Sequence, residues 1–337
     1  MKVLRFLLFP FAILYDFVTR IRNLFFDIGF FKSTAFETPI VIVGNLSLGG
    51  TGKTPQIEYL VRMLQESFKV SILSRGYKRS SKGFILVNET HTAQTVGDEP
   101  LQYYRKFKNI HVAVDANRVA GISKLMASVK PEVILLDDAF QHRKVQGSCT
   151  ILLTKWDALF VADYVVPTGN LREGKYGAKR ADIILVTKCP EDLSIQQQAV
   201  VKQKLTRFQK KIFFTSISYA KTILGAQKIQ TAVLKDFNVL LITGIANPTP
   251  LSDYLSGLGV RFHHLKFGDH HAFSEKDIHS IQTKFNAMEA PKMMLTTEKD
   301  YVRLVDILTA VSYLPIETFF LNNEEQAFKA IIAKSLK

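Results

Sequence analysis

Cysteine, tryptophan and acidic residues are scarce in this sequence. It has two cysteines, Cys149 and Cys189, and one tryptophan in 337 residues. Two cysteines exclude a disulfide scaffold and a cysteine-based zinc site, and they favour a reducing compartment. Asp and Glu number 30 against 44 Lys and Arg, so the net charge is +14. Such a chain prefers anionic partners, namely nucleic acid, an anionic membrane surface or a phosphorylated substrate.

The rest of the composition is that of a globular protein. Hydrophobic residues make up 47% and charged residues 22% of the chain, which excludes disordered, collagen-like and coiled-coil proteins. A chain of this length is expected to form about two domains. It is also long enough to bury a large hydrophobic core, so it does not need disulfide bonds or structural metal ions for stability.

The first 32 residues lack an apolar run long enough to cross a membrane. The unbroken run, residues 6–15, has 10 residues, whereas a spanning helix needs about 20. No small-residue cleavage site follows it, so a secretory signal is not expected. Eight of the 25 phenylalanines lie in this segment, and the apolar residues recur at helical spacing. Basic residues surround this apolar stripe: Lys2, Arg5, Arg20, Arg22 and Lys32.

This pattern predicts an amphipathic, membrane-anchoring helix within residues 1–32 that lies in the headgroup region. The alternative interpretation is a helix that packs on the protein's own core.

Short apolar runs alternate with amphipathic stretches from residue 36 onward. Runs without a polar interruption indicate strands buried on both faces, and hence a mostly parallel sheet flanked by helices. The predicted strands are 39–43, 70–73, 110–114, 133–136, 151–153, 183–186, 239–242 and 293–295, and the predicted helices are 56–66, 196–209 and 250–258. The pattern restarts near residue 219. We therefore predict an α/β core domain over residues 33–218 and a smaller carboxy-terminal α/β lobe over residues 219–337.

A glycine-rich stretch, GNLSLGGTGKT at residues 44–54, follows the first strand and opens a helix. It fits the P-loop pattern G-x-x-x-x-G-K-[ST], except that Ser47 stands at the first glycine. The glycines let backbone N–H groups point at phosphate, Lys53 can reach the β- and γ-phosphates, and Thr54 can bind Mg²⁺. The stretch predicts a P-loop NTPase-like fold with a nucleotide site formed by Ser47, Gly49, Gly50, Thr51, Gly52, Lys53 and Thr54. The alternative is a glycine-rich turn that binds nothing.

Two carboxylates, Asp137 and Asp138, end the strand at 133–136. This is where a P-loop protein places a Mg²⁺ ligand, beside the phosphate loop at the carboxyl ends of the strands. The alternative is a helix N-cap, which Asp also favours.

Further polar blocks occupy loops where a doubly wound sheet binds its ligands. Each alone fits a solvated turn, but several in one sheet indicate a shared site. These blocks are SRGYKR at 74–79, GDEP at 97–100, DANR at 115–118, QHR at 141–143 and GNLRE at 169–173. In the second lobe, DHHAF at 269–273 lacks the i, i+4 histidine spacing of zinc helices and indicates a general-base partner or substrate contact. The alternative is a capped turn with surface histidines. TEKD at 297–300 fits a helix N-cap.

In order and number, these blocks resemble the tetraacyldisaccharide 4′-kinase family, the lipid A 4′-kinases of Gram-negative bacteria. The resemblance covers nearly the whole chain, and Ser47 is usual in that family. Ala139 stands where the family often has glycine. The resemblance implies a kinase that uses ATP and Mg²⁺ to phosphorylate the 4′-hydroxyl of an acylated glucosamine disaccharide 1-phosphate, a lipid A precursor. It also implies an anionic inner-membrane surface as a partner, with the enzyme on the cytoplasmic face.

The resemblance also implies roles for individual residues. Asp98 is expected to be the base with His270 as its partner, and Lys53 and Arg172 are expected to serve the phosphates. The remaining expected residues are Thr54, Asp137, Asp138 and Glu173 at the metal, and Tyr77, Arg118, Gln141 and His142 around the substrate.

Three other functions compete with this interpretation. A soluble small-molecule P-loop kinase has no reason to expose an apolar stripe in residues 1–32. A membrane-associated NTPase switch is disfavoured because Leu48 replaces the second lysine of the switch ATPases, and because Cys189-Pro190 stands where a guanine-reading loop needs x-Asp. The net charge permits a nucleic-acid binder, but no nucleic-acid-binding motif is recognised. We therefore expect no nucleic-acid partner.

Overall fold

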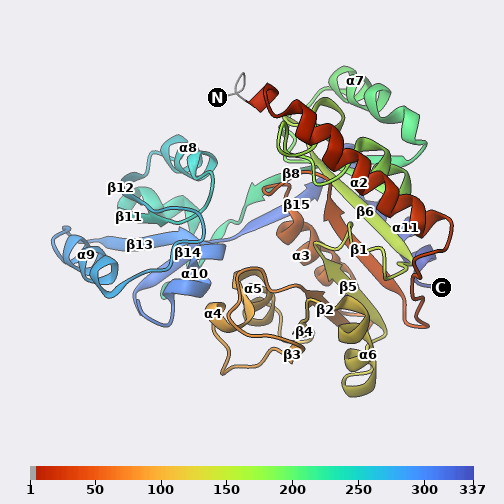
Figure 1. The fold of residues 1–337 in the computed structure, drawn as a ribbon. Helices are drawn as coiled ribbons and strands as arrows, with labels where there is room; N and C mark the ends of the chain where they lie inside the picture. The colour runs from red at the N-terminus through yellow and green to blue at the C-terminus, as the bar shows by residue number, and fades with distance from the viewer. Residues whose placement is uncertain (1–4) are drawn as a thin grey trace.

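The protein folds into two α/β lobes, as seen in a computed structural model that describes residues 5–337. Residues 1–4, including Lys2 of the predicted basic flank, lie outside the described residues. Two strands, β8 (Lys211–Tyr219) and β15 (Ile316–Phe320), run between the lobes and pair antiparallel with each other (Figure 1).

The larger lobe is built on a nine-stranded sheet in the order β15-β8-β7-β6-β1-β5-β2-β4-β3. Its central strands pair in parallel, and only the edge strands β3 and β15 run antiparallel to their neighbours. The strands are β1 (Ile40–Asn45), β2 (Val70–Ser74), β3 (Ile85–Leu86), β4 (His111–Val114), β5 (Val133–Asp137), β6 (Cys149–Lys155) and β7 (Ile183–Thr187), with β8 and β15. Every residue of β1 and β5 is buried, as their uninterrupted apolar sequences predicted.

Helices cover both faces of this sheet. Val41 and Val43 of β1 pack in one core with α3 (Lys53–Leu64), α5 (Asp98–Lys106) and α11 (Glu325–Ser335). Ile40 and Ile42 face the opposite side, where they pack with α6 (Arg118–Ser128). A further core on β6 and β7 includes α7 (Ile195–Leu205). A short helix, α4 (Ala93–Val96), precedes α5. The predicted α/β fold class with a mostly parallel sheet is confirmed.

The smaller lobe has a six-stranded sheet in the order β10-β9-β14-β13-β11-β12. Helices α8, α9 and α10 connect the parallel strands of this sheet along the chain. The elements are β9 (Thr222–Gly225), β10 (Ile229–Gln230), β11 (Asn238–Thr243), α8 (Thr249–Gly257), β12 (Arg261–Lys266), α9 (Glu275–Asn286), β13 (Lys292–Thr297), α10 (Glu298–Leu304) and β14 (Val311–Leu314).

The carboxy-terminal segment returns to the larger lobe. Strand β15 joins the nine-stranded sheet, and Phe328 of α11 is fully buried against Tyr59 and Phe213. The smaller sheet therefore ends at Leu314, whereas the sequence placed all of 219–337 in the second lobe. The order of strands and helices in the sequence could not predict this return, because the last strand and helix could have packed on the sheet of either lobe.

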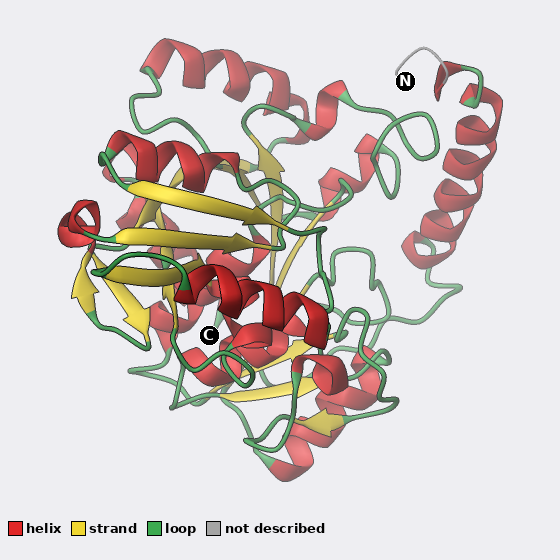
Figure 2. Ribbon diagram, turned by 90° about the vertical axis from the view of Figure 1, so that its left-hand side faces the viewer, coloured by secondary structure: helices red, strands yellow, loops and turns green. Residues whose placement is uncertain are grey.

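The amino-terminal helix α2 (Phe9–Asp27) lies on the outside of the larger lobe (Figures 1 and 2). Its buried residues are Ala12 and Asn23, whereas Phe11, Leu14 and Phe17 are about 60% exposed. The helix therefore docks through a face that includes the polar Asn23, and it turns many of its apolar side chains outward. No helix in the described part of the chain is long and apolar enough to cross a membrane.

Candidate active site

The phosphate loop lies between β1 and α3, where the sequence placed it. Gly49, Gly50 and Gly52 have φ of 64°, 64° and 82°, a region that L-residues with side chains rarely adopt. Thr51 is buried, and its hydroxyl accepts a hydrogen bond of 2.8 Å from Asn45 Nδ2. The Thr51 carbonyl accepts one of 2.8 Å from the Thr187 hydroxyl at the end of β7. The loop is thus anchored to the ends of β1 and β7, and α3 starts at Lys53.

The GNLRE loop pairs with the phosphate loop. Ser47 forms a β-bridge with Leu171, and Leu48 N–H donates to the Asn170 carbonyl at 2.7 Å. The Arg172 N–H donates to the Leu46 carbonyl at 2.7 Å. This pairing explains how a residue more than 100 positions along the chain reaches the phosphate site.

Two cations converge on Asp138. Arg172 Nη1 donates to its two carboxylate oxygens at 2.9 and 3.0 Å, and Lys53 Nζ lies 3.6 Å from Oδ1. Burial alone would raise the pKa of Asp138, but Lys53 and Arg172 hold it below its usual value. Asp138 is therefore an anion that orients both predicted phosphate-binding cations.

The pKa of Asp137 is raised, in contrast to that of Asp138. Asp137 is fully buried, and burial together with the charges of Glu99 and Asp138 raises its pKa to about 8. Its Oδ1 has no hydrogen-bond partner among the described residues, while Oδ2 accepts from Ser74 and Tyr103 at 3.4 Å. A buried, under-coordinated carboxylate beside other carboxylates favours a cation.

Glu99 is a site residue that the sequence reasoning missed. The GDEP block was read as a turn with Asp98 as its functional residue. In the structure, Asp98 and Glu99 open helix α5, and Gly97 caps it with φ of 96°. Thr54 Oγ1 donates to Glu99 Oε1 at 3.1 Å, so Glu99 faces the phosphate loop. The adjacent carboxylates of GDEP were the available signal.

Asp98 and His270 come together from different lobes. His270 Nδ1 lies 2.8 Å from Asp98 Oδ2, and the two side chains are 20% and 11% exposed. His270 adopts φ of 58° in the loop after β12. The ring of Tyr77, 62% exposed, meets the His270 ring edge to face at 5.8 Å. The structure therefore gathers three predicted residues at one point between the lobes.

The other predicted substrate residues are more enclosed than Tyr77. Arg118 is 3% exposed and donates to the Asp115 and Asp137 carbonyls, and burial lowers its pKa to about 10. Burial, together with Arg118 and Arg75, lowers the pKa of His142 to about 4, so this ring is neutral near pH 7. Gln141 Nε2 donates to the Asn45 carbonyl at 2.9 Å.

Glu173 has different surroundings from those expected of a metal ligand. Its carboxylate accepts hydrogen bonds from Arg180 at 2.6 Å, from Asn23 of α2 at 2.7 Å and from Gln141 at 3.3 Å. It is 2% exposed. Its contacts link helix α2 to the active-site loops, a role that no local sequence pattern indicated.

Comparison with known proteins decides the family. The sequence matches the tetraacyldisaccharide-1-P 4′-kinase family over residues 4–337. The chain belongs to this family. Tetraacyldisaccharide 4′-kinase of Flavobacterium johnsoniae is 50% identical over 342 residues, which cover 100% of this chain and 98% of that protein. That of Bacteroides thetaiotaomicron is 38% identical, covering 95% and 90% of the two chains.

A solved structure extends the comparison to the fold. The crystal structure of LpxK from Aquifex aeolicus in complex with ATP superposes with a TM-score of 0.81 at 30% identity, over 99% of this chain and 100% of that chain. The family and fold predicted from the sequence are thus confirmed. Membership of a kinase family over the full chain favours phosphoryl transfer over the NTPase switch.

A buried ion cluster in this 4′-kinase family member joins the lobes behind the Asp98–His270 pair. Lys106 Nζ, at the end of α5, lies 2.6 Å from Glu58 of α3 and 2.8 Å from Glu298 of α10. Glu58 also accepts from Gln102 at 2.8 Å. Burial, and then the charge of Glu58, raises the pKa of Glu298 to about 7. Lys106 therefore ties the phosphate-loop helix to the second lobe.

Lys106→Met is expected to destabilise the protein by about 3 kcal/mol, because it leaves two buried carboxylates without their shared cation. The raised pKa means that folded Glu298 binds its proton more tightly than unfolded Glu298. This stabilising contribution is complete below about pH 4.5 and is lost as pH rises through about 7. The loss of Tm in Lys106→Met should therefore be larger at pH 8 than at pH 5.5.

Differential scanning calorimetry at both pH values tests this expectation. Lys329→Met removes a partner of the exposed Glu325 and should change stability by less than about 0.5 kcal/mol. Equal Tm losses for Lys106→Met and Lys329→Met would contradict the buried cluster.

Proposed function

We propose that this chain transfers the γ-phosphate of ATP to the 4′-hydroxyl of an acylated glucosamine disaccharide 1-phosphate, at the cytoplasmic face of the inner membrane. The observation that carries the proposal is a P-loop joined directly to a carboxylate–histidine pair. Thr54 of the loop bonds Glu99 at 3.1 Å, and the neighbouring Asp98 bonds His270 at 2.8 Å. Family membership supplies the substrate class.

The phosphate loop and its cations suit phosphoryl transfer. This reaction depends on positioning and on neutralising charge around the phosphoryl group. The backbone N–H groups of residues 47–54 would bind the phosphates, and Lys53 and Arg172 would contribute positive charge. Asp138 holds both cations near the loop, so little rearrangement is needed when phosphate arrives.

The acidic residues beside the loop fit Mg²⁺. Asp137 Oδ1 is buried without a partner among the described residues, and the pKa of Asp137 is raised to about 8 by burial and by its acidic neighbours. Asp137, Asp138 and the Thr54 hydroxyl are the oxygen groups that would hold the ion. Mg²⁺ supplies positive charge to the phosphates when it is bound.

Within residues 5–337, no three His, Cys, Asp or Glu side chains converge as a ready-made metal centre. Such a sparse protein contribution suits Mg²⁺, which usually keeps waters and phosphate oxygens as ligands. Because Glu173 is bonded to Arg180, Asn23 and Gln141, we assign it to the docking of α2 and not to the metal.

Helix α2 suits a membrane surface because many of its apolar side chains face outward, whereas polar side chains bind it to the larger lobe. Asn23, Arg143 and Glu173 make polar contacts beneath it, with Arg143 Nη1 donating to the Asn23 carbonyl at 2.7 Å. Its outer face carries exposed apolar side chains, among them Phe11, Leu14 and Phe17. An exposed apolar stripe with nearby cations is the pattern of an interfacial helix.

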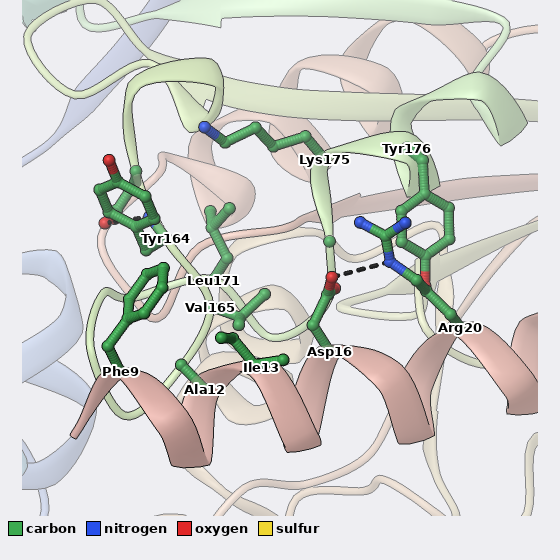
Figure 3. A pocket seen from close by; sticks show the side chains of 12 residues that line it. Phe9, Ala12, Ile13, Asp16, Arg20, Tyr164, Val165, Leu171, Lys175 and Tyr176 are labelled. Atoms are coloured by element: carbon green, nitrogen blue, oxygen red, sulfur yellow. Dashed lines mark hydrogen bonds and ion pairs between the residues drawn. The ribbon is translucent and has the colours of Figure 1, made fainter.

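The same helix lies against the active-site loop. The Tyr15 hydroxyl donates to the Arg172 carbonyl at 2.8 Å. Beside it, a cavity of about 220 Å³ opens between α2 and the loop containing Tyr164 and Leu171 (Figure 3). Ala12, Ile13 and Val165 contribute apolar lining, and Asp16 pairs with Arg20 at one end (Figure 3). A lipid acceptor at the membrane surface would thus approach close to Arg172.

The proposal is tested by transfer of radiolabelled γ-phosphate from ATP to the acylated disaccharide 1-phosphate in detergent micelles. Two acceptors serve as controls, the disaccharide already phosphorylated at the 4′ position and the same sugar without acyl chains. We expect labelling of the acylated 4′-hydroxyl form alone. Efficient labelling of the deacylated sugar would favour a soluble small-molecule kinase, and ATP hydrolysis without labelling would favour an NTPase switch.

Leu14→Glu/Phe17→Glu is expected to release the protein from anionic liposomes and to raise the KM for the lipid about tenfold, with the KM for ATP nearly unchanged. Both side chains point outward, so the contacts that dock α2 remain. Flotation with liposomes and steady-state kinetics measure the two effects. Ile307→Glu, at an exposed site of the second lobe, is the matched control. Flotation equal to wild type would refute membrane binding by this face.

A further inference from the structure

We propose that Lys299 fixes the tautomer of His270, so that His270 donates a hydrogen bond from Nδ1 to Asp98 and the proton taken from the acceptor hydroxyl stays on Asp98. This inference rests on the proposed function. Lys299 belongs to the TEKD block, which the sequence explained only as a helix cap. In the structure, Thr297 is that cap, and Lys299 is left for another role.

The hydrogen bonds determine the tautomer. Lys299 Nζ lies 3.1 Å from His270 Nε2. A lysine ammonium has three donors and no acceptor, so Nε2 must accept and cannot carry a hydrogen. The ring proton then resides on Nδ1, which lies 2.8 Å from Asp98 Oδ2 and donates to it. His270 in this arrangement is neutral and has both ring nitrogens engaged.

The charges around His270 support this assignment. Lys299 also forms an ion pair with Asp269, whose Oδ1 lies 3.6 Å from Nζ. Asp269 is 4.0 Å from His270 Nε2, too far for a hydrogen bond that would hold a proton there. Arg303 Nε, from the same helix as Lys299, lies 3.7 Å from Asp98 Oδ2. Tyr77 contacts the His270 ring in a T-shaped arrangement and adds no charge.

The tautomer decides where the transferred proton goes. The acceptor O–H bond breaks, its proton moves to Asp98, and the oxygen forms a bond to the γ-phosphorus. The bond between the γ-phosphorus and the β,γ-bridging oxygen breaks, and its electron pair leaves with ADP. His270 cannot take the proton onward, because Nδ1 already carries one and Nε2 is covered by Lys299. Asp98 Oδ1, without a hydrogen-bond donor among residues 5–337, is the oxygen left for the acceptor.

Lys299 is therefore a positioning residue whose effect depends on pH. In Lys299→Met, Nε2 is free to bind a proton at low pH, and an imidazolium beside Asp98 would make that carboxylate a weaker base. We expect kcat/KM of Lys299→Met to fall about tenfold at pH 6 but to stay within about threefold of wild type at pH 8.5. Lys299→Arg keeps a cationic donor and should restore the wild-type profile. Lys276→Met, on α9, is the control.

Nuclear magnetic resonance identifies the tautomer of His270 independently of enzyme activity. Long-range ¹H–¹⁵N spectra of protein labelled with ¹⁵N-histidine contain eight rings, and His270→Gln identifies the signal of His270. We expect a protonated Nδ1 and a bare Nε2 in the wild type, and a tautomer mixture or imidazolium in Lys299→Met at pH 6.

Three results would overturn the proposal. These are a hydrogen on Nε2 in the wild type, an unchanged spectrum in Lys299→Met, and an equal loss of activity at every pH, which would indicate a structural role only. Failure of the proposed function is distinguishable, because the wild type would then not phosphorylate the disaccharide while the spectra still report the tautomer.

Discussion

Lys53→Ala is expected to reduce phosphate transfer by about 1,000-fold or more, while the protein remains folded. Lys53 opens helix α3 directly after the phosphate loop, and its side chain is 10% exposed. It has no partner closer than Asp138 at 3.6 Å among its ion pairs in the described chain, so its charge is available to phosphate. Its removal leaves Arg172 as the remaining cation on Asp138.

Initial rates of labelled phosphate transfer measure this loss, and circular dichroism and Tm verify the fold. Lys108→Ala removes an exposed lysine from the same lobe and should keep full activity. Turnover at the wild-type rate by a folded Lys53→Ala protein would refute the nucleotide site at this loop.

Asp98→Ala and His270→Ala are each expected to lower kcat by about 100- to 10,000-fold, and the double variant should lose little more than the worse single one. A sugar hydroxyl is a poor nucleophile near neutral pH, so its proton needs an acceptor during transfer. The two side chains share a 2.8 Å hydrogen bond, which makes them one functional unit. Removing either side chain is therefore expected to remove most of the contribution of the pair to kcat.

A double-mutant cycle on kcat, at saturating ATP and lipid, measures the coupling. Losses that multiply would mean that the residues act separately. An acidic limb of the pH–rate profile that survives both substitutions would also count against the pair. Tyr254→Phe, in the second lobe and stacked on Tyr219, is a control for general effects of lobe substitutions.

The pair also shows how the two lobes depend on each other. Asp98 belongs to the larger lobe and His270 to the smaller one. In the structure they are already in contact, with Lys106 and Arg105 bonding α5 to α10 behind them. Catalysis at this point therefore needs the lobe interface to be intact, which makes the Lys106→Met variant informative for activity as well as stability.

Local features were readable from the sequence because local chemistry determines them. Uninterrupted apolar runs indicated buried parallel strands, and the observed strands β1, β2, β5 and β7 agree with them to within about two residues, the usual uncertainty of element ends. The phosphate loop was predictable because left-handed backbone conformations need glycine. Asp137 and Asp138 could be placed because a buried strand that ends in carboxylates delivers them to the ligand-binding edge of a sheet.

The tertiary structure alone decided contacts between distant segments. In sequence, Glu99 fits a solvated turn and Lys299 fits a helix start. They face Thr54 and His270 only because separate elements within each lobe pack together. Glu173 is next to the predicted phosphate-binding Arg172, but its side chain turns toward α2.

The amino-terminal helix shows the same division. Its amphipathic character follows from the spacing of apolar residues, which is a property of 19 residues in a row. Its outward apolar face depends on polar partners more than 100 residues away, Glu173 and Arg143, which bind Asn23 on the inner face. Hydrogen-bond partners of a buried polar side chain come from the fold, so periodicity determined the helix and packing determined which face is free.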